Sequence, residues 1–220
     1  SYIYPKVYRP KIYYPGPKIN FKILFESLKN SEFKKQAIIK SKKVKSIQIE
    51  NKTILFKKYI TLTLRDYGYS PERNTAQTDI NHILDFAESN YFKLVIIPDN
   101  INNIKKYKIP ESSFISYEAR ESISKRIEIY SNSELNILPP SGPFLLSMFI
   151  ENTKTIIYNL SKNWESDNIT PRKFKSTYKF GYGDQPYLDL SCYVIWHNKF
   201  RVFDINKIKD SYKILQKLTK

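Results

Sequence analysis

The chain has 220 residues, of which 41% are hydrophobic and 15% aromatic, and its formal net charge is +16. This length and apolar content suit one sizeable domain or two small ones with a buried core, which excludes a globally disordered protein. A single cysteine, Cys192, excludes an internal disulfide and a zinc site built from several cysteines.

No apolar run approaches the ~18 residues of a membrane-spanning helix, and no basic stretch followed by an apolar one indicates a signal peptide. We therefore expect a cytoplasmic protein. The chain starts at Ser1 and its one methionine is Met148, which indicates a fragment or a processed product. We accordingly expect a second domain outside this sequence.

The net positive charge has two explanations. It would suit a polyanionic partner such as nucleic acid, an anionic membrane or a phosphorylated ligand. However, Lys, Asn, Ile, Tyr and Phe are all abundant and share AT-rich codons, so the base composition of the gene would produce the same excess. The scattered lysines favour this second explanation. With either explanation, peripheral contact with the anionic inner face of a membrane remains an expectation.

Residues 1–57 are predicted to form an extension that packs on the main domain. Residues 1–18 are predicted to be irregular, because they are rich in Tyr and Pro and proline disfavours both helices and central strands. A short helix is predicted over residues 19–30. Two short strands, KSIQIE and KTILF, are predicted to meet at a turn near Asn51.

The main domain is predicted to begin with a strand, a loop, a helix and a second strand. Residues 58–74, KYITLTLRDYGYSPERN, start as a strand, because apolar residues alternate with threonines, and end in a polar loop. A helix is predicted over residues 75–90, with Asn74 or Thr75 as its N-cap. Residues 92–98, FKLVIIP, predict a buried parallel strand.

Strands and helices continue to alternate toward the end of the chain. A helix is predicted over residues 116–132, with Ile123 on its buried face, and a last helix over residues 206–218, with Asn206 as its cap. The order predicts an α/β domain over residues 58–220, with a mostly parallel sheet and right-handed crossovers. The other expected elements are strands at 135–138 and 154–160, a helix after the loop at 139–144, and a strand CYVIWHN.

The loop Arg65–Asn74 follows the first strand of this domain, and ligands of open α/β sheets bind at the carboxyl ends of the strands. Arg65 and Arg73 present planar forks of donors that suit a phosphate or a carboxylate. The alternative is that these arginines pair with Asp66 or Glu72 and only fix the loop. We favour an anion site, because long loops at this end of a sheet commonly carry function.

A second candidate is the segment Ser141, Gly142, Pro143 and Phe144, between a short strand and a helix. Glycine permits close approach of a ligand to the backbone, proline suits the first helical position, and N–H groups there can face an anion. An ordinary strand-to-helix turn explains the segment equally well. Neither GxxxxGK[ST] nor GxGxxG occurs in the chain.

Three further residues are candidates for contacts with a sugar or a base. Asp184 and Gln185 lie in the loop GYGDQPYL and have polar groups that suit sugar hydroxyls, although composition alone favours a plain surface loop. Asp99 follows a strand and, by analogy with dinucleotide-binding folds, either binds a ribose hydroxyl or caps the next turn. His82 and His197 have no companion at metal-ligand spacing, so we predict no metal site, and no catalytic base stands out.

An ordered set of motifs resembles a family of bacterial glycosyltransferase-like proteins found with surface-polysaccharide genes. These motifs are TLTLRDYGYSPERN, VIIPD, RIEIYSNSELNILPPSGPFLLSMF and GDQPYL. The similarity runs over residues 60–200, with a weaker echo in the N-terminal Tyr/Pro segment. The resemblance implies a Rossmann-like domain of the two-domain, B-type glycosyltransferase kind, which holds a nucleotide-sugar.

The resemblance also implies roles for individual residues. Arg65 and Arg73 would face the diphosphate, and Asn74 would orient their loop. The segment Ser141 to Phe144 would supply backbone donors, and Gln185 would touch the sugar or the base.

Our first hypothesis is therefore an enzyme that transfers a sugar from a nucleotide-sugar donor to a glycan or glycolipid acceptor in surface-polysaccharide biosynthesis, with no cofactor and no metal. Basic side chains and backbone donors would stabilise the leaving diphosphate. The second hypothesis is a non-catalytic nucleotide- or glycan-binding module. The third is a basic nucleic-acid-binding protein, for which the chain has no helix-turn-helix, zinc-finger or RRM signature.

Overall fold

The structure is a computed structural model. It does not describe three parts for which the sequence made predictions, namely the Tyr/Pro-rich N-terminal segment, the helix at 19–30 and the loop with Asp184 and Gln185. The described residues are 47–49, 52–54, 58–68, 71–100, 102, 104–139, 141–160, 193–198 and 203–218.

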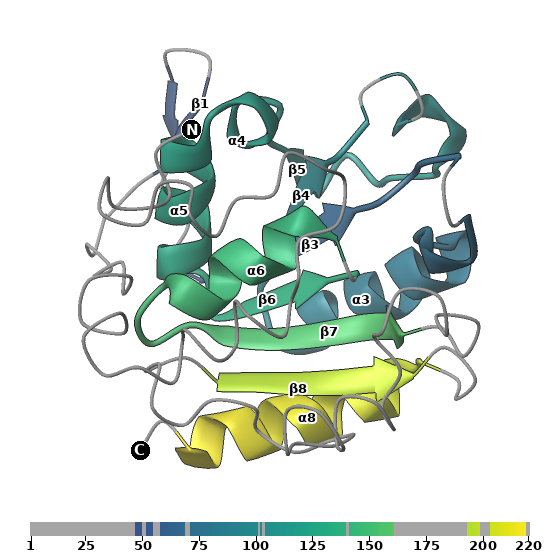
Figure 1. Ribbon diagram of the computed structural model, residues 1–220, viewed down its shortest axis with the longest axis vertical. Coiled ribbons are helices and arrows are strands. Elements are labelled where there is room, and N and C mark those ends of the chain that lie inside the picture. Colours follow the sequence, from purple (N-terminus) through teal and green to yellow (C-terminus); the bar gives the residue numbers. More distant parts are fainter. Residues whose placement is uncertain are drawn as a thin grey trace, which may run out of the picture.

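A six-stranded sheet in which every neighbouring pair is parallel forms the centre of the described chain (Figure 1). The strand order is β5-β4-β3-β6-β7-β8, which is the 3-2-1-4-5-6 order of doubly wound dinucleotide-binding folds. The predicted Rossmann-like α/β class is therefore confirmed. The strands are β3 (Tyr59–Leu64), β4 (Lys93–Pro98), β5 (Phe114–Ile115), β6 (Leu135–Leu138), β7 (Lys154–Leu160) and β8 (Tyr193–Asn198).

Helices cover both faces of this sheet (Figure 1). Helices α3 and α8 pack against each other on one face, and α5 packs against α6 on the other. The α-helices in the described ranges are α3 (Gln77–Ser89), α4 (Glu118–Glu121), α5 (Ile123–Asn132), α6 (Gly142–Phe149) and α8 (Ile205–Leu218), and the 3₁₀ turns there are η2 (Pro71–Arg73) and η3 (Ile104–Lys106).

The alternation in β3 reflects two different buried faces, since all six of its residues are buried. Its isoleucine and leucines join the apolar core with residues of α3 and α8. Its threonines face the α5 side, where Thr61 Oγ1 donates to Asn136 Oδ1 at 2.7 Å and Thr63 Oγ1 shares a 2.5 Å hydrogen bond with Tyr130 Oη. A strand of this kind needs partners for every buried hydroxyl, and each threonine has one.

The predicted helix over residues 116–132 is wrong as a single element. It is interrupted at Ser122, which has extended backbone (φ −108°, ψ 115°) and whose hydroxyl accepts a hydrogen bond from Lys125 N at 3.2 Å. Serine favours such an N-cap because its short side chain satisfies a free N–H group. The break changes the orientation of the second helix, and Ile123, expected on the buried face, is 43% exposed.

Two predicted helix caps are also wrong. Helix α3 begins after Ala76, whose N–H donates to Asp79 Oδ2 at 2.9 Å, because Asn74 and Thr75 are engaged in the preceding loop. Helix α8 is capped by Asp204, which accepts from Lys207 N at 3.0 Å, and not by Asn206.

Other local predictions are confirmed or extended. The predicted pair of short strands is present as β1 (Ile47–Ile49) and β2 (Lys52–Ile54), which pair antiparallel. The two-residue strand β5 was not predicted, because so short a segment has no periodicity. Within the described ranges, no helix combines the length and the apolar character needed to cross a lipid bilayer.

Candidate functional site

An open cavity of about 650 Å³ lies where β3, β4 and β6 end. The chain continues from β3 toward one edge of the sheet and from β6 toward the other, so the cavity lies at the topological switch point where doubly wound folds bind their ligands. Four arginines line it, together with Tyr67, Asp99, Glu121 and the turn at residues 141–143. The arginines are Arg65, Arg73, Arg120 and Arg126.

Arg65 directly follows β3 and is only 4% exposed. Its backbone is fixed to the end of the loop, because Thr75 N donates to Arg65 O at 3.0 Å and Arg65 N donates to Thr75 Oγ1 at 3.1 Å. Its guanidinium donates to Asn74 Oδ1 and lies 5.4 Å from the centre of the Tyr67 ring. The loop therefore presents this arginine to the cavity in a defined orientation.

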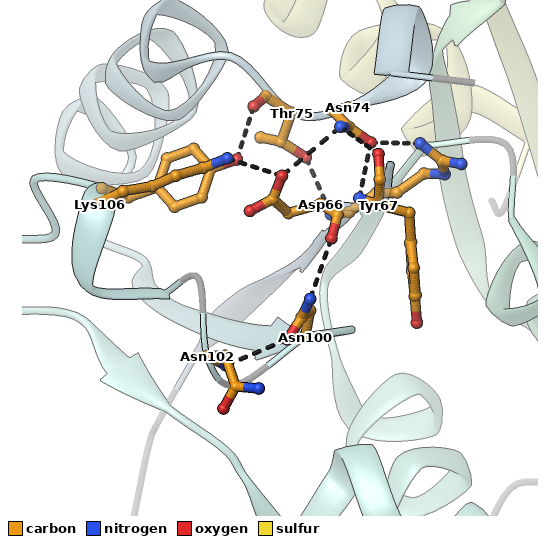
Figure 2. A network of polar contacts seen from close by, with 9 residues as sticks. Asp66, Tyr67, Asn74, Thr75, Asn100, Asn102 and Lys106 are labelled. Carbon is orange, nitrogen blue, oxygen red and sulfur yellow. Dashed lines mark hydrogen bonds and ion pairs between the residues drawn. The ribbon is translucent and has the colours of Figure 1, made fainter. Parts of the chain in front are cut away.

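Asn74 holds the two ends of this loop together, as Figure 2 shows. Its Oδ1 accepts from Tyr67 N at 3.1 Å, and its Nδ2 donates to Tyr67 O at 2.8 Å. Its Nδ2 also lies 3.5 Å from Asp66 Oδ1. The side chain thus acts as a bridge between the end of β3 and η2.

Replacing Asn74 by Ala is expected to lower the free energy of unfolding by about 1–3 kcal/mol, because several polar groups lose their partner together. Hydrogen exchange of the Tyr67 amide should accelerate in the same variant. Asn102→Ala, at an exposed position, is the matched control and should change neither quantity. An unchanged Tyr67 exchange rate in Asn74→Ala would contradict the bridging role.

Asp66 is not paired with an arginine, contrary to one alternative reading of the loop. Lys106, from η3, donates to its Oδ1 at 2.6 Å, while Asn100 Nδ2 lies 3.4 Å from its backbone oxygen (Figure 2). Tyr107, next to that lysine, donates to Thr75 O at 3.1 Å. The acidic side chain therefore ties the loop to the segment after β4, and the arginines of the cavity are not neutralised by it.

Arg120 and Arg126 were missed by sequence reasoning, and they come from the two short helices on either side of Ser122. Arg126 is 8% exposed, its Nε donates to Ala119 O at 2.8 Å, and its Nη1 lies 3.7 Å from Asp99 Oδ1. Arg120 Nε donates to Asp99 O at 3.2 Å, and its Nη1 lies 3.3 Å from Glu121 Oε1. The break at Ser122 leaves the Ala119 carbonyl available to Arg126, which a continuous helix would not.

A compositional signal for these residues did exist. Seven of the 37 basic residues are arginines, and four of those seven line this one cavity. No lysine lines it. AT-rich codons explain the many lysines, but they do not explain why the scarce arginines gather at one place.

Asp99 lies in the middle of this cluster, directly after β4, and is 9% exposed. Its backbone oxygen accepts hydrogen bonds from Tyr67 Oη and Arg120 Nε, each at 3.2 Å. Burial raises the pKa of its carboxyl from 3.8 to about 6, although the arginines around it act to lower that pKa. A carboxylate that titrates near neutral pH inside a basic cavity is typical of a functional site.

The turn before α6 forms the side of the cavity next to β6. Ser141, Gly142 and Pro143 line the cavity, and a side chain added at Gly142 would meet nothing within 4 Å, so a ligand can approach the backbone there. Phe144 is 2% exposed and its N–H donates to Ser141 O at 3.2 Å. Phe144 thus anchors the turn in the core, while the three residues before it face the cavity.

The structure brings together most residues that the sequence singled out. Six of them line the cavity. Asn74 does not line it but holds the Arg65 loop, and Phe144 is buried and anchors the turn before α6. Asp184 and Gln185 lie outside the described residues. Among the described residues, no group of three or more His, Cys, Asp and Glu side chains could hold a metal ion. The six are Arg65, Arg73, Asp99, Ser141, Gly142 and Pro143.

No protein-family model, no curated protein and no solved structure matches this chain.

Proposed function

We propose that this cavity binds the diphosphate of a nucleotide-sugar, and that the protein is a glycosyltransferase-like protein that transfers the sugar to a glycan or glycolipid acceptor in surface-polysaccharide biosynthesis. One observation carries the proposal: four arginines converge on a single cavity at the switch point of a parallel sheet. Ligands of such sheets bind at this point.

The charge and shape of the cavity suit a diphosphate. Among the described residues that line the cavity, four arginines oppose two carboxylates, Asp99 and Glu121, so this part of the lining carries an excess of positive charge. Arginine presents a planar fork that bonds two phosphate oxygens at once, which lysine does not. The volume of about 650 Å³ falls within the range of about 300–1,000 Å³ for sites that hold small molecules. A concave site of this size does not suit a nucleic-acid duplex.

The same groups would assist transfer of the sugar. When the bond between sugar and diphosphate breaks, negative charge grows on the leaving diphosphate. Guanidinium groups that the fold already holds in place stabilise such charge without having to reorganise. A metal-independent reaction is the simplest form of the proposal. We further propose that a second domain holds the acceptor and that the protein contacts an anionic membrane.

Stabilisation by nucleotides tests this proposal. We expect one class of nucleoside diphosphate sugar, from a panel of UDP-, GDP- and ADP-sugars, to raise the melting temperature selectively, whereas a CMP-sugar, which carries a single phosphate, should not. A ligand at about 100 times its Kd adds about 2.7 kcal/mol of stability. If no member of the panel raises the melting temperature, the proposal is contradicted. Consumption of the bound donor, with a glycan acceptor present, then separates a transferase from a binding module.

Arg126→Gln tests the assignment of the site. We expect it to weaken binding of that nucleotide-sugar by about 30-fold or more, since removing a largely buried charge partner costs about 2 kcal/mol at least. Lys125→Gln is the matched control, because it removes the same charge from the adjacent residue, which pairs with Glu128 at 3.1 Å and does not line the cavity. Equal affinities of the two variants would show that the ligand binds elsewhere.

A further inference from the structure

The Asp99 carboxylate holds an unusual position for a residue in an anion site. It lines the cavity, its side chain is 6% exposed, and its nearest charged neighbour is Arg126 Nη1 at 3.7 Å. Within the described part of the chain, its carboxylate oxygens make no hydrogen bond. The backbone of the same residue, in contrast, is held at both ends, because Asp99 N donates to Leu64 O at 2.9 Å and its carbonyl accepts two hydrogen bonds.

An anionic ligand among these arginines meets a carboxylate of the same sign. The ligand competes with Asp99 for the guanidinium groups of Arg65, Arg120 and Arg126, and it repels the ionised carboxylate at short range. The Asp99 side chain is buried and the backbone that carries it is fixed on both sides, so the carboxylate stays close to the ligand. The repulsion is removed most simply if the carboxylate takes up a proton.

We infer that the site takes up its anionic ligand together with one proton, and that the protonated carboxyl of Asp99 donates a hydrogen bond to the ligand. This inference rests on the proposed function for the identity of the ligand, a diphosphate, but it holds for any dianion that occupies the arginine cluster. It makes Asp99 a residue that determines specificity, since a neutral ligand would gain nothing from the added proton.

The titration properties of the neighbourhood agree with this role. Burial raises the pKa of Asp99 to about 6, and the arginines from the β3 loop, α4 and α5 act against that rise. A bound dianion offsets the arginines, so the pKa should rise further in the complex. The tyrosines near Asp99 stay neutral, because burial raises the pKa of Tyr130 on α5 to about 12 and also raises the pKa values of Tyr67 and of Tyr158 on β7.

The sign of the effect follows from these two pKa values. Above about pH 6 the free protein has Asp99 ionised, whereas the complex has it protonated until the pH passes the higher pKa of the complex. Binding therefore takes up a proton in this window, and affinity falls about tenfold for each pH unit. Below about pH 6 the carboxyl is protonated in both states, and this dependence disappears.

Sulfate is the probe of choice, because it stays dianionic throughout this pH window and, unlike a terminal phosphate, does not itself titrate there. Calorimetric titration of the whole chain with sulfate, in Bis-Tris and in imidazole, gives the number of protons taken up from the difference in apparent enthalpy. We expect a value approaching one proton per sulfate at pH 7 in the wild-type protein. A value of zero with clear sulfate binding, or no sulfate binding at all, would overturn the inference.

Two variants identify the group that holds the proton. Asp99→Asn should bind sulfate with no proton uptake and with an affinity that no longer depends on pH above 6. Glu121→Gln is the matched control, because that carboxylate also lines the cavity but its side chain is 70% exposed, and proton uptake should persist. Persistent uptake in Asp99→Asn would overturn the assignment to Asp99.

The same titrations separate the inference from the proposed function. If sulfate binds with proton uptake while no nucleotide-sugar binds, the proton-linked anion site stands and the proposed function fails. If a nucleotide-sugar binds without proton uptake, the proposed function stands and the inference fails.

Discussion

Replacing Asp99 by Asn is expected to raise the free energy of unfolding at pH 7 by as much as about 3 kcal/mol. The pKa of the carboxyl rises from 3.8 to about 6 on folding, which corresponds to about 3 kcal/mol against the ionised form. Because the folded pKa is the higher one, the stability that the protonated carboxyl contributes is complete below about pH 4 and is lost as the pH rises through 6. An asparagine side chain stays neutral at every pH, so the variant does not lose this stability at pH 7.

Urea unfolding at several pH values checks this expectation. The two proteins should be about equally stable near pH 4, and the advantage of the variant should grow between pH 4 and 6 and then stay constant. Asp85→Asn, at an exposed position on α3, is the control and should show no such growth. If the variant is less stable than the wild type at pH 7, the attraction between the arginines and the ionised Asp99 exceeds the cost of burying that charge.

This result would bear on function as well as on stability. A buried carboxylate that lowers stability when ionised is a feature of sites that need a group titrating near neutral pH. If Asp99→Asn is more stable and also loses proton-linked anion binding, one side chain accounts for both effects. Stability and ligand binding would then make opposite demands on Asp99, as is common at functional sites.

Replacing Phe86 by Ala is expected to lower the free energy of unfolding by about 3–5 kcal/mol, the range for truncating a buried aromatic residue. Phe86 lies on α3, is 1% exposed, and contacts the ring of Tyr212 on α8 edge-on at 5.6 Å between centroids. Phe92 completes the cluster, with its ring 5.8 Å from that of Tyr212. The cluster joins α3, the start of β4 and the last helix.

Denaturant unfolding measures this loss, and hydrogen exchange locates it. Amides of α8 should exchange faster in Phe86→Ala than in the wild type, because the helix loses part of its contact with α3. Tyr91→Ala is the control, since this aromatic residue lies next to Phe92 but is 94% exposed, and surface changes usually stay within about 0.5 kcal/mol. A loss below 1 kcal/mol in Phe86→Ala would contradict the packing described for the core.

Elements whose signal is local can be predicted from the amino-acid sequence alone. The alternation over β3 and the helical spacing of Ile80, Ile83, Leu84 and Ala87 depend only on which residues follow one another, and all four helix residues are buried. The order of strands and helices then predicted a parallel sheet, because parallel strands need crossovers. The loop with Arg65 could be selected for the same reason, since its position after a strand is visible in the sequence.

Which residues share the site, in contrast, depends on how the chain folds. Arg120 and Arg126 lie more than 50 positions along the chain from Arg65, and they reach the same cavity because the connection from β5 to β6 brings their helices beside Asp99, at the carboxyl end of β4. The positions of these two arginines also depend on the break at Ser122. That break was not predicted, because the helical spacing of apolar residues continues on both sides of it. Periodicity reports the face of a single element, whereas the cavity, the burial of Asp99 and the resulting rise of its pKa depend on elements that meet only in the folded protein.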